Sequence, residues 1–327
     1  MFVLGLQGSP RKNGNTSKLL SAFLHQAESL GAQTRYLDVP RMNIHPCRGC
    51  GNCEKKAFCP IDDDMQEVFP LLREADIILM ATPVFFYGAT AQIKGLIDRS
   101  QVLWARKYIH NLEDPGRKWR LGLLLSVGAT KGKDLFEGIS LTAKYFFDAV
   151  GAGFEGGLVY KKIEGPTDIE RHPSALNDTR KKAADLVGRF LRRKKILFVC
   201  TRNACRSQMA AAFARYHAGD RIDARSAGSA PADAVDPGMV EVMREKGLDM
   251  AFCRPSAIDT ESDGLRPELV VSMGCGETCP AVPGAGQLTW DLPDPEGESV
   301  DFMREVRDEI EKRVKALIGS VTVPITR

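Results

Sequence analysis

The stretch ILFVCTRNACRSQMAAAF, residues 196–213, joins an apolar run of strand length to a run of helical composition. The apolar run ends on Cys200, and Arg206 stands just before the helical residues. A loop between a strand and a helix can direct several backbone N–H groups inward, and such loops bind oxyanions. These donors and the Arg206 guanidinium would hold Cys200 as a thiolate, the nucleophilic form of cysteine. The pattern therefore predicts in-line attack of Cys200 on a bound phosphate-like anion.

A carboxyl group that could complete this chemistry lies downstream, in DLPDPEG at residues 291–297. There Asp294 precedes Pro295, and it is expected to act as the general acid for a leaving oxygen. The alternative is a buried cysteine at a strand end and an unrelated surface arginine. The order of apolar strand, C-x5-R-S and amphipathic helix argues against that alternative.

The length of 327 residues exceeds what one hydrophobic core commonly holds, and so predicts two domains. Apolar runs alternate with amphipathic runs throughout, which predicts α/β domains with doubly wound parallel sheets covered on both faces. The alternation restarts at KKILFVC, residues 194–200. We therefore expect a first domain over residues 1–193 and a second over residues 194–327.

The amino-acid composition limits the possible binding partners and the cellular compartment of the protein. A net charge of +3 is too small to indicate nucleic acid or an anionic membrane as a partner. No apolar run approaches the ~20 residues that cross a bilayer, and the start lacks the charged region of a signal peptide. We expect a cytoplasmic protein. Because the cytosol is reducing, nine clustered cysteines indicate metal or redox chemistry rather than structural disulfides.

Residues 195–318 resemble the low-molecular-weight protein tyrosine phosphatase superfamily and, within it, the thioredoxin-type arsenate reductases. VCTRNACRSQMA is similar to the nucleophile loop, SAGSAP to the next strand and turn, and DLPDP to the general-acid loop. The resemblance implies a low-molecular-weight phosphatase-like fold and an arsenate or phosphate-like oxyanion as substrate. It assigns the nucleophile to Cys200, the oxyanion clamp to Arg206, a hydrogen bond to the thiolate to Ser207 and the general acid to Asp294.

The stretch VSMGCGETCP, residues 271–280, favours the reductase over the phosphatase. Phosphate ester hydrolysis has no use for Cys275 and Cys279. Arsenate reduction needs a second thiol to release arsenite from the Cys200 adduct and a third to resolve the disulfide, and the resemblance assigns these roles to Cys275 and Cys279. Arg202 departs from the usual glycine of the superfamily. A protein tyrosine phosphatase with a fused redox regulator and a non-catalytic redox sensor stay open as alternatives.

In the first half, GLQGSPRKNGNTSKLL at residues 5–20 reads as a strand, a polar turn and a helix. Its hydroxyl, amide and backbone donors at a helix N-terminus predict a phosphate cradle, with an ordinary polar cap as the alternative. The candidate phosphate ligands are Ser9, Arg11, Asn13, Asn15, Thr16 and Ser17.

Two further loops follow apolar strands, ATPVFFYG at residues 81–88 and SVGATKG at residues 126–132. Open α/β sheets bind ligands at the carboxyl ends of their strands, and an aromatic-rich loop there suits a flat ring. Core packing is the alternative for the two phenylalanines. The candidate residues are Pro83, Val84, Phe85, Phe86, Tyr87 and Gly88 in the first loop, and Ser126 and Gly128 in the second.

These three loops together resemble the flavodoxin-like NAD(P)H-dependent FMN reductases. The resemblance covers residues 1 to about 190 and implies bound FMN that accepts hydride from NADH or NADPH. It also implies a homodimer, because two chains commonly build each flavin site in that group.

The motif CRGCGNCEKKAFCP, residues 47–60, is close to the ferredoxin-type run for a [4Fe–4S] cluster. Thiolates are the right ligands for iron–sulfur or for zinc, and a loop without metal that supports the flavin or a dimer contact is the third alternative. The motif resembles the iron–sulfur flavoproteins. The candidate metal ligands are Cys47, Cys50, Cys53 and Cys59.

Fusion of the two halves suggests a purpose. An arsenate reductase ends each turnover as a disulfide, and a flavin domain collects electron pairs from NAD(P)H. We expect the first domain to reduce the Cys275–Cys279 disulfide at high effective concentration. The alternative is that thioredoxin reduces it and the first domain acts separately.

Overall fold

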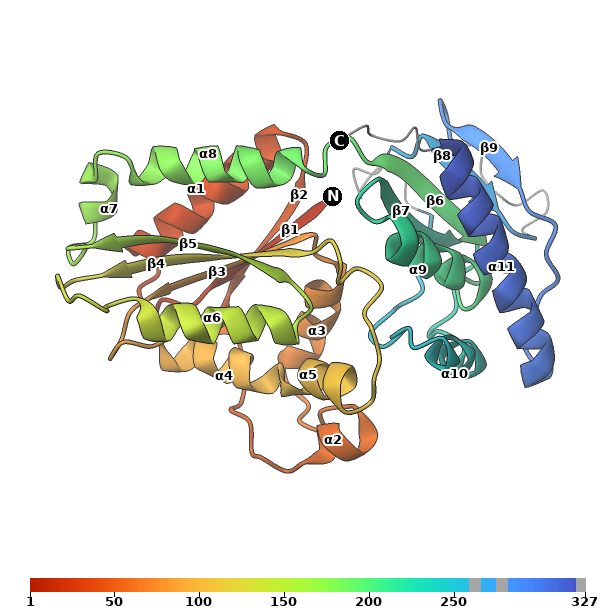
Figure 1. The fold of residues 1–327 in the computed structure, drawn as a ribbon, viewed down its shortest axis with the longest axis horizontal. Coiled ribbons are helices and arrows are strands. Elements are labelled where there is room, and N and C mark those ends of the chain that lie inside the picture. The colour runs from red at the N-terminus through yellow and green to blue at the C-terminus, as the bar shows by residue number, and fades with distance from the viewer. Residues whose placement is uncertain (259–265, 275–281, 322–327) are drawn as a thin grey trace. The chain divides into compact units, whose positions relative to one another are not determined.

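A computed structural model of the protein describes residues 1–258, 266–274 and 282–321. The chain divides into two compact units (Figure 1). One comprises Met1–Asn111 and Arg117–Leu191, and the other comprises Leu112–Gly116 and Arg192–Arg327. Each unit contains its own parallel sheet, so the prediction of two doubly wound α/β folds is confirmed.

The first unit is built on a five-stranded sheet with the order β2-β1-β3-β4-β5. All four strand pairs are parallel, and a register irregularity interrupts β4 and β5 between Gly122 and Leu124. The central strands are apolar on both sides because helices cover both faces. The strands are β1 Phe2–Gln7, β2 Gln33–Asp38, β3 Ile77–Pro83, β4 Leu121–Gly128 and β5 Gly153–Lys161.

Helices α1 and α8 lie on one face of this sheet, and α3, α4 and α6 lie on the other (Figure 1). Leu19 and Phe23 of α1 and Leu186 of α8 form one buried cluster with Ile77 and Leu79 of β3. The elements are α1 Asn15–Ser29, η1 Val39–Arg41, α2 Asn52–Lys56, α3 Met65–Glu74, α4 Ala91–Arg99, α5 Gln101–Tyr108, α6 Glu137–Ala149, α7 Asp168–Arg171 and α8 Ala175–Gly188.

The second unit is built on a four-stranded parallel sheet with the order β7-β6-β8-β9. Phe198 of β6, Met209 and Phe213 of α9, and Ile310 of α11 are buried in one cluster on a face of this sheet. The elements are β6 Lys194–Cys200, α9 Arg206–Ala218, β7 Ile222–Gly228, α10 Pro237–Glu245, β8 Leu269–Ser272, β9 Gly286–Thr289 and α11 Val300–Val321. Within the described ranges, no helix combines the length and the apolar character needed to span a membrane.

Candidate functional site

The thiol loop lies between a buried strand and a helix, as its sequence predicts. Strand β6 ends at Cys200 and α9 begins at Arg206. The loop packs closely on the end of β7, where a Cβ at Gly228 would lie 2.7 Å from the carbonyl oxygen of Thr201. The strand end and the helix start are therefore held at a fixed separation, which brings the nucleophile and the guanidinium to the same end of the sheet.

Cys200 is buried and its sulfur has a polar neighbour. Its Sγ lies 3.0 Å from Oγ of Ser207. Asn203 donates from Nδ2 to that same Oγ at 2.7 Å, which leaves the hydrogen of the Ser207 hydroxyl free for the sulfur. The Ser207 hydroxyl can therefore donate to the sulfur, a contact that suits a nucleophilic cysteine.

Asn203 is a site residue that our sequence reasoning missed. Its φ of 50° is left-handed, a conformation that asparagine tolerates better than most residues. Its Oδ1 accepts from the backbone N–H of Ser256 at 2.9 Å and from Nε2 of Gln208 at 3.1 Å. These two bonds fix the amide so that Nδ2 points to Ser207. An asparagine inside a C-x5-R loop is the signal that could have identified it.

The Arg206 side chain is buried, and only some of its N–H groups have hydrogen-bond acceptors among the described residues. Nη1 donates to the carbonyl oxygen of Leu292 at 3.2 Å, and Nη2 pairs with Asp294. Gly274, at φ 72°, leaves room for the guanidinium, because a Cβ there would lie 2.5 Å from Nη1. Nε has no acceptor in the part of the chain that the structure describes. A buried N–H without an acceptor is costly, so this donor fits an oxyanion that is bound during function.

Two ion pairs join the thiol loop to the stretch that contains the expected acid. Arg206 pairs with Asp294, and Arg202 pairs with Glu296. The backbone N–H of Glu296 also donates to Oδ1 of Asp294 at 3.3 Å. The arginine that departs from the superfamily pattern thus has a partner, and Asp294 lies at the clamp although 88 positions separate it from Arg206.

The other cysteines of the second unit differ in their burial. Cys205 is buried, and burial raises the pKa of its thiol, with nearby carboxylates adding to the rise, so the protonated form persists at neutral pH. Cys253 is half-buried. Cys275 and Cys279 lie outside the described residues.

In the first unit, the predicted phosphate loop ends at the start of α1. Ser9, Asn15, Thr16 and Ser17 are buried, whereas Arg11 and Asn13 are exposed. Among the residues that the structure describes, no side chain caps the N-terminus of α1. An uncapped helix N-terminus is the usual setting of an anion site.

Several of the predicted side chains bind other parts of the protein. The amide of Asn15 donates to the carbonyl oxygen of Gly165 at 2.8 Å and accepts from the backbone N–H of Ile169 at 3.2 Å. The hydroxyl of Ser17 lies 3.1 Å from that of Tyr36. Arg11 donates to the carbonyl oxygen of Glu164 at 3.0 Å. These three side chains hold the loop in place.

Gln7 is a second residue that sequence reasoning missed. It is buried at the carboxyl end of β1, and its Oε1 accepts from the hydroxyl of Thr16 at 3.4 Å. Its Nε2 has no acceptor among the residues whose placement is described. A polar residue at the end of the apolar run FVLGL was the available signal. The unsatisfied donor and the uncapped helix suit a phosphorylated cofactor with hydrogen-bond acceptors.

The aromatic loop after β3 is a tight, strained turn. Phe85 and Gly88 exchange backbone hydrogen bonds of 3.1 and 2.9 Å, and Phe86 and Tyr87 between them have φ values of 48° and 62°. A turn of this kind requires two residues in the left-handed backbone conformation, which aromatic residues rarely adopt. Phe86 is 103% exposed, and Phe85 and Tyr87 are about half exposed. The two phenylalanines are therefore not core residues, and the turn presents its rings outward.

Hydrogen bonds hold the loops after β1, β3 and β4 at one edge of the sheet. The hydroxyl of Thr90 donates to the carbonyl oxygen of Gly8 at 2.5 Å, and the backbone N–H of Val84 donates to the carbonyl oxygen of Val127 at 2.9 Å. Ser126 is buried and donates to the carbonyl oxygen of Thr82 at 2.7 Å. The exposed rings, the uncapped helix and the buried amide thus lie along the edge where a flavin is expected.

In the cysteine-rich loop, Cys47 and Cys50 are exposed, and Cys53 and Cys59 are half-buried. The chemistry of four free thiols fits an iron–sulfur cluster or zinc. Across the described residues, however, no three potential ligands are arranged to hold a metal ion. The four cysteines therefore suit a metal by their chemistry, but their placement in the described loop does not form a metal site without rearrangement.

Residues that sequence reasoning missed anchor this loop. Arg99 is fully buried and binds both carboxylate oxygens of Asp63, at 2.6 and 3.0 Å. It also donates to the carbonyl oxygens of His45 and Ile61. Burial raises the pKa of the Asp63 carboxyl, but the hydrogen bonds from Arg99 and from the backbone N–H groups of His45 and Met65 lower it by more. The pKa therefore lies below its usual value, and the pair stays charged. The pair holds the segments before and after the four cysteines on α4.

Comparison with known proteins places each half of the chain. The family model described as NADPH-dependent FMN reductase matches residues 1–134, and the model described as low molecular weight phosphotyrosine protein phosphatase matches residues 195–324. The glutaredoxin arsenate reductase of Synechocystis is 32% identical over 131 residues, which is 39% of this chain and 99% of that protein. The chain belongs to the arsenate reductase family. An NADPH-dependent FMN reductase family domain precedes its arsenate reductase domain in the same chain.

Two further comparisons concern one half each. The iron-sulfur flavoprotein of Methanosarcina thermophila is 37% identical over 131 residues, which is 40% of this chain. The chain spans only 65% of the length of that relative. A solved structure of an arsenate reductase in the phosphate binding state is 32% identical, with a TM-score of 0.35, and covers 39% of this chain and 99% of its own.

Proposed function

We propose that this protein is an arsenate reductase that carries its own flavin-dependent electron source. Residues 194–327 would form the reductase domain and residues 1–193 the FMN-binding domain. The observation that carries the proposal is the thiol loop, where Cys200 contacts Ser207 and the buried Nε of Arg206 lacks an acceptor among the described residues. A nucleophilic sulfur beside an unsatisfied cationic donor suits a tetrahedral oxyanion. Relatives named arsenate reductase support this substrate.

The proposed reduction begins when the Cys200 thiolate attacks arsenic and forms a sulfur–arsenic bond. Asp294 protonates the departing oxygen, which leaves as water. The Cys275 thiolate then attacks the Cys200 sulfur, and the sulfur–arsenic bond breaks with its electron pair left on arsenic, which gives arsenite. Cys279 attacks Cys275 and frees Cys200. Two thiolates become one disulfide, and arsenate gains two electrons.

The first domain would return electrons to that disulfide. FMN, when bound, supplies the capacity to accept hydride from NAD(P)H and to pass on an electron pair. The aromatic turn at residues 85–88 would hold the flat ring, and the loop over residues 9–17 with the uncapped start of α1 would hold the phosphate. Gln7 would donate its free amide N–H to the cofactor. Thioredoxin as the reductant is the alternative.

Three subsidiary proposals complete this function. Cys47, Cys50, Cys53 and Cys59 would ligate a [4Fe–4S] cluster after the loop rearranges, and measurement of iron and acid-labile sulfide against zinc in anaerobically purified protein tests this. A homodimer would build the flavin site, which light scattering tests. The redox-active thiols suit a cytoplasmic location, where disulfides are kept reduced.

The deciding experiment adds arsenate and NADPH to anaerobically purified protein without thioredoxin. We expect NADPH consumption that matches arsenite release and that Cys200→Ser abolishes. Cys253→Ser is the matched control, because Cys253 lies outside the thiol loop, and it should leave the activity unchanged. NADPH consumption that does not depend on arsenate would contradict electron transfer from the first domain to the disulfide of the second. Arsenite release only after thioredoxin is added would leave a reductase without the internal electron source.

A second candidate function is phosphatase activity. The contact between Arg206 and Asp294 favours it, because hydrolysis of a phosphate ester needs the same clamp and the same acid. It predicts that p-nitrophenyl phosphate is hydrolysed and that Cys275→Ser retains the activity. Absence of hydrolysis at an intact Cys200 would exclude it.

A further inference from the structure

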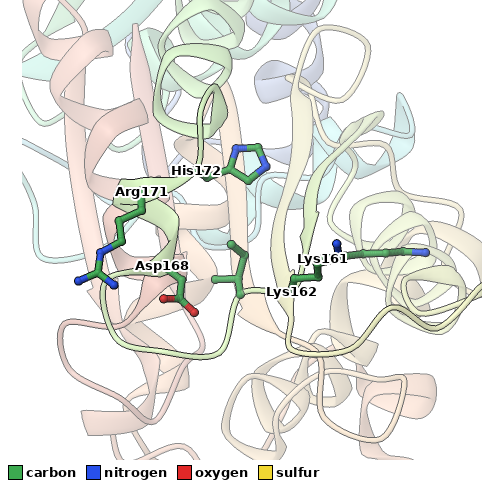
Figure 2. Close-up of a pocket in the computed structure, with 6 residues that line it drawn as sticks. Lys161, Lys162, Asp168, Arg171 and His172 are labelled. Carbon is green, nitrogen blue, oxygen red and sulfur yellow. The ribbon is translucent and has the colours of Figure 1, made fainter.

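Charged side chains gather at the carboxyl end of β5 and at the thiol loop, with different consequences. Figure 2 shows the first of these places, a hollow in the first unit. There Arg171 interacts with the Asp168 carboxylate, and Nζ of Lys161 donates to the carbonyl oxygen of Gly132 at 2.6 Å. These charges fasten neighbouring loops to one another. At the thiol loop, the charged groups instead join two segments that carry catalytic residues of the proposed function.

Two arginines of the thiol loop hold the stretch that contains the expected acid. Nη1 of Arg206 donates to the carbonyl oxygen of Leu292 at 3.2 Å, and the guanidinium of Arg202 pairs with the carboxylate of Glu296. Asp294 lies between these two points along the chain and itself pairs with Arg206. The expected general acid therefore has one anchor two residues before it and another two residues after it.

The backbone around Asp294 couples its carboxylate to these anchors. Pro293 and Pro295 flank the aspartate, and a proline ring restricts φ to about −65°. The backbone N–H of Glu296 also donates to Oδ1 of Asp294 at 3.3 Å. A displacement of Glu296 would therefore move the Asp294 carboxylate with it.

Binding of an oxyanion would change one of these contacts and leave the others. The anion competes with Asp294 for Nη2 of Arg206, so the carboxyl group is released toward the departing oxygen. The bond to Leu292 uses the other terminal nitrogen of Arg206, and the pair of Arg202 and Glu296 involves neither nitrogen. These two contacts are therefore available to keep Asp294 at the thiol loop after it leaves the clamp.

Arg202 occupies a position where the superfamily commonly has glycine. A glycine has no side chain for an ion pair, so the anchor at Glu296 depends on the arginine. Arg202 is not among the residues with a positive φ, so a side chain at this position causes no backbone strain. The Arg202 side chain is 54% exposed and that of Glu296 28%, which leaves the buried clamp to Arg206 alone.

We propose that Arg202 is a positioning residue for the general acid. Its ion pair with Glu296 keeps Asp294 at the thiol loop when the oxyanion displaces that carboxyl group from Arg206. This inference rests on the proposed function, because it gives Arg202 a role in the same arsenate reduction. The step that it serves is proton transfer from Asp294 to the arsenate hydroxyl that leaves as water, while the Cys200 sulfur forms its bond to arsenic.

The kinetic test is a single turnover of arsenate by the full-length protein, with its thiols reduced beforehand by dithiothreitol that is then removed. We expect Arg202→Gln and Glu296→Gln each to lower the rate at saturating arsenate about fivefold, the effect of losing one partly exposed ion pair. The half-saturating arsenate concentration should change less than about twofold. Arg202→Lys keeps the charge and should retain most of the rate. Arg244→Gln and Glu298→Gln are the matched controls at exposed positions and should resemble the wild type.

A double-mutant cycle separates positioning of the acid from a general loss of structure. If Arg202 acts through Asp294, Arg202→Gln should lower the rate no further in the Asp294→Asn background. An equal fall in both backgrounds would overturn the inference. A higher half-saturating arsenate concentration in Arg202→Gln at an unchanged maximal rate would also overturn it, because Arg202 would then bind the anion directly.

Hydrogen exchange separates this inference from the proposed function, because it requires no turnover. In the presence of inorganic phosphate, we expect the peptide that contains residues 291–298 to exchange about fivefold faster in Arg202→Gln than in the wild type, since one anchor against local opening is lost. If this difference appears while the wild type releases no arsenite, the reductase proposal fails and Arg202 is confirmed as the anchor of Asp294. Equal exchange in the two proteins would overturn the inference even where arsenite is released.

Discussion

At the scale of single residues, the thiol site depends on an asparagine in an unusual backbone conformation. Asn203 is held by Gln208 and by the backbone of Ser256, and it donates to Ser207. The Ser207 hydroxyl is then oriented toward the Cys200 sulfur at 3.0 Å. We therefore expect the reactivity of the sulfur to depend on Asn203, which does not contact it.

Asn203→Ala removes the donor that orients Ser207, so the Cys200 sulfur loses an oriented hydroxyl neighbour. We expect alkylation of Cys200 by iodoacetamide at neutral pH to slow roughly tenfold, the effect of losing one hydrogen bond to a charged group. Mass spectrometry of the peptide that contains Cys200 measures this rate. Asn177→Ala, at an exposed position on α8, is the control and should leave the rate unchanged. An unchanged rate in Asn203→Ala would refute this account of the loop.

The ion pair between Arg206 and Asp294 predicts competition between the carboxylate and the oxyanion. In Asp294→Asn the competing charge is absent, so we expect phosphate to bind several-fold more tightly. Turnover of arsenate should fall roughly a hundredfold, because the general acid is missing. Titration calorimetry with phosphate and an arsenite assay measure the two effects. Asp291→Asn removes the same charge from an exposed position in the same stretch and should change neither quantity. Weaker phosphate binding in Asp294→Asn would contradict the competition.

At the scale of elements, the alternation of apolar and amphipathic runs predicted the two α/β folds but not every element or boundary. The stretch AQIKGLIDRSQVL reads as one helix, yet it divides at Ser100 into α4 and α5. The hydroxyl of Ser100 donates to the carbonyl oxygen of Leu96, and this local bond competes with the regular helix ladder. Strand β9, GQLT, was not predicted because all its residues are exposed and lack apolar alternation.

The aromatic turn depends on its packing against α6. A Cβ at Gly138 would lie 2.5 Å from the backbone carbonyl oxygen of Tyr87, so Gly138→Ala must displace the turn. We expect weaker retention of FMN by at least several-fold, measured as the flavin-to-protein absorbance ratio after dialysis. Gly188→Ala is the control, because nothing lies within 4 Å of a Cβ there. FMN retention equal to that of the wild type would show that the turn does not hold the ring.

At the scale of the whole molecule, the proposed function would replace a diffusing reductant with one tethered in the same chain. Tethered groups meet at effective concentrations that reach the millimolar range for short connections, whatever the protein concentration. We therefore expect NADPH-dependent arsenite release per chain to stay constant over roughly a hundredfold dilution. The measurement is the initial rate at saturating NADPH and arsenate without thioredoxin. A rate per chain that falls in proportion to protein concentration would indicate electron transfer between separate molecules.

The sequence by itself determined the parts of this protein that depend on neighbours along the chain. Periodicity predicted two parallel-sheet folds, and the short motif Cys200-x5-Arg206 predicted a strand, a loop and a helix in that order, because backbone conformation follows from nearby side chains. Tertiary structure alone decided which distant groups meet. Folding places Asp294 against Arg206, and the pair of Arg99 and Asp63 holds the four-cysteine loop. Folding also leaves the Gln7 amide without an acceptor among the described residues and exposes Phe86. Such contacts arise from the packing of whole elements, which no local pattern encodes.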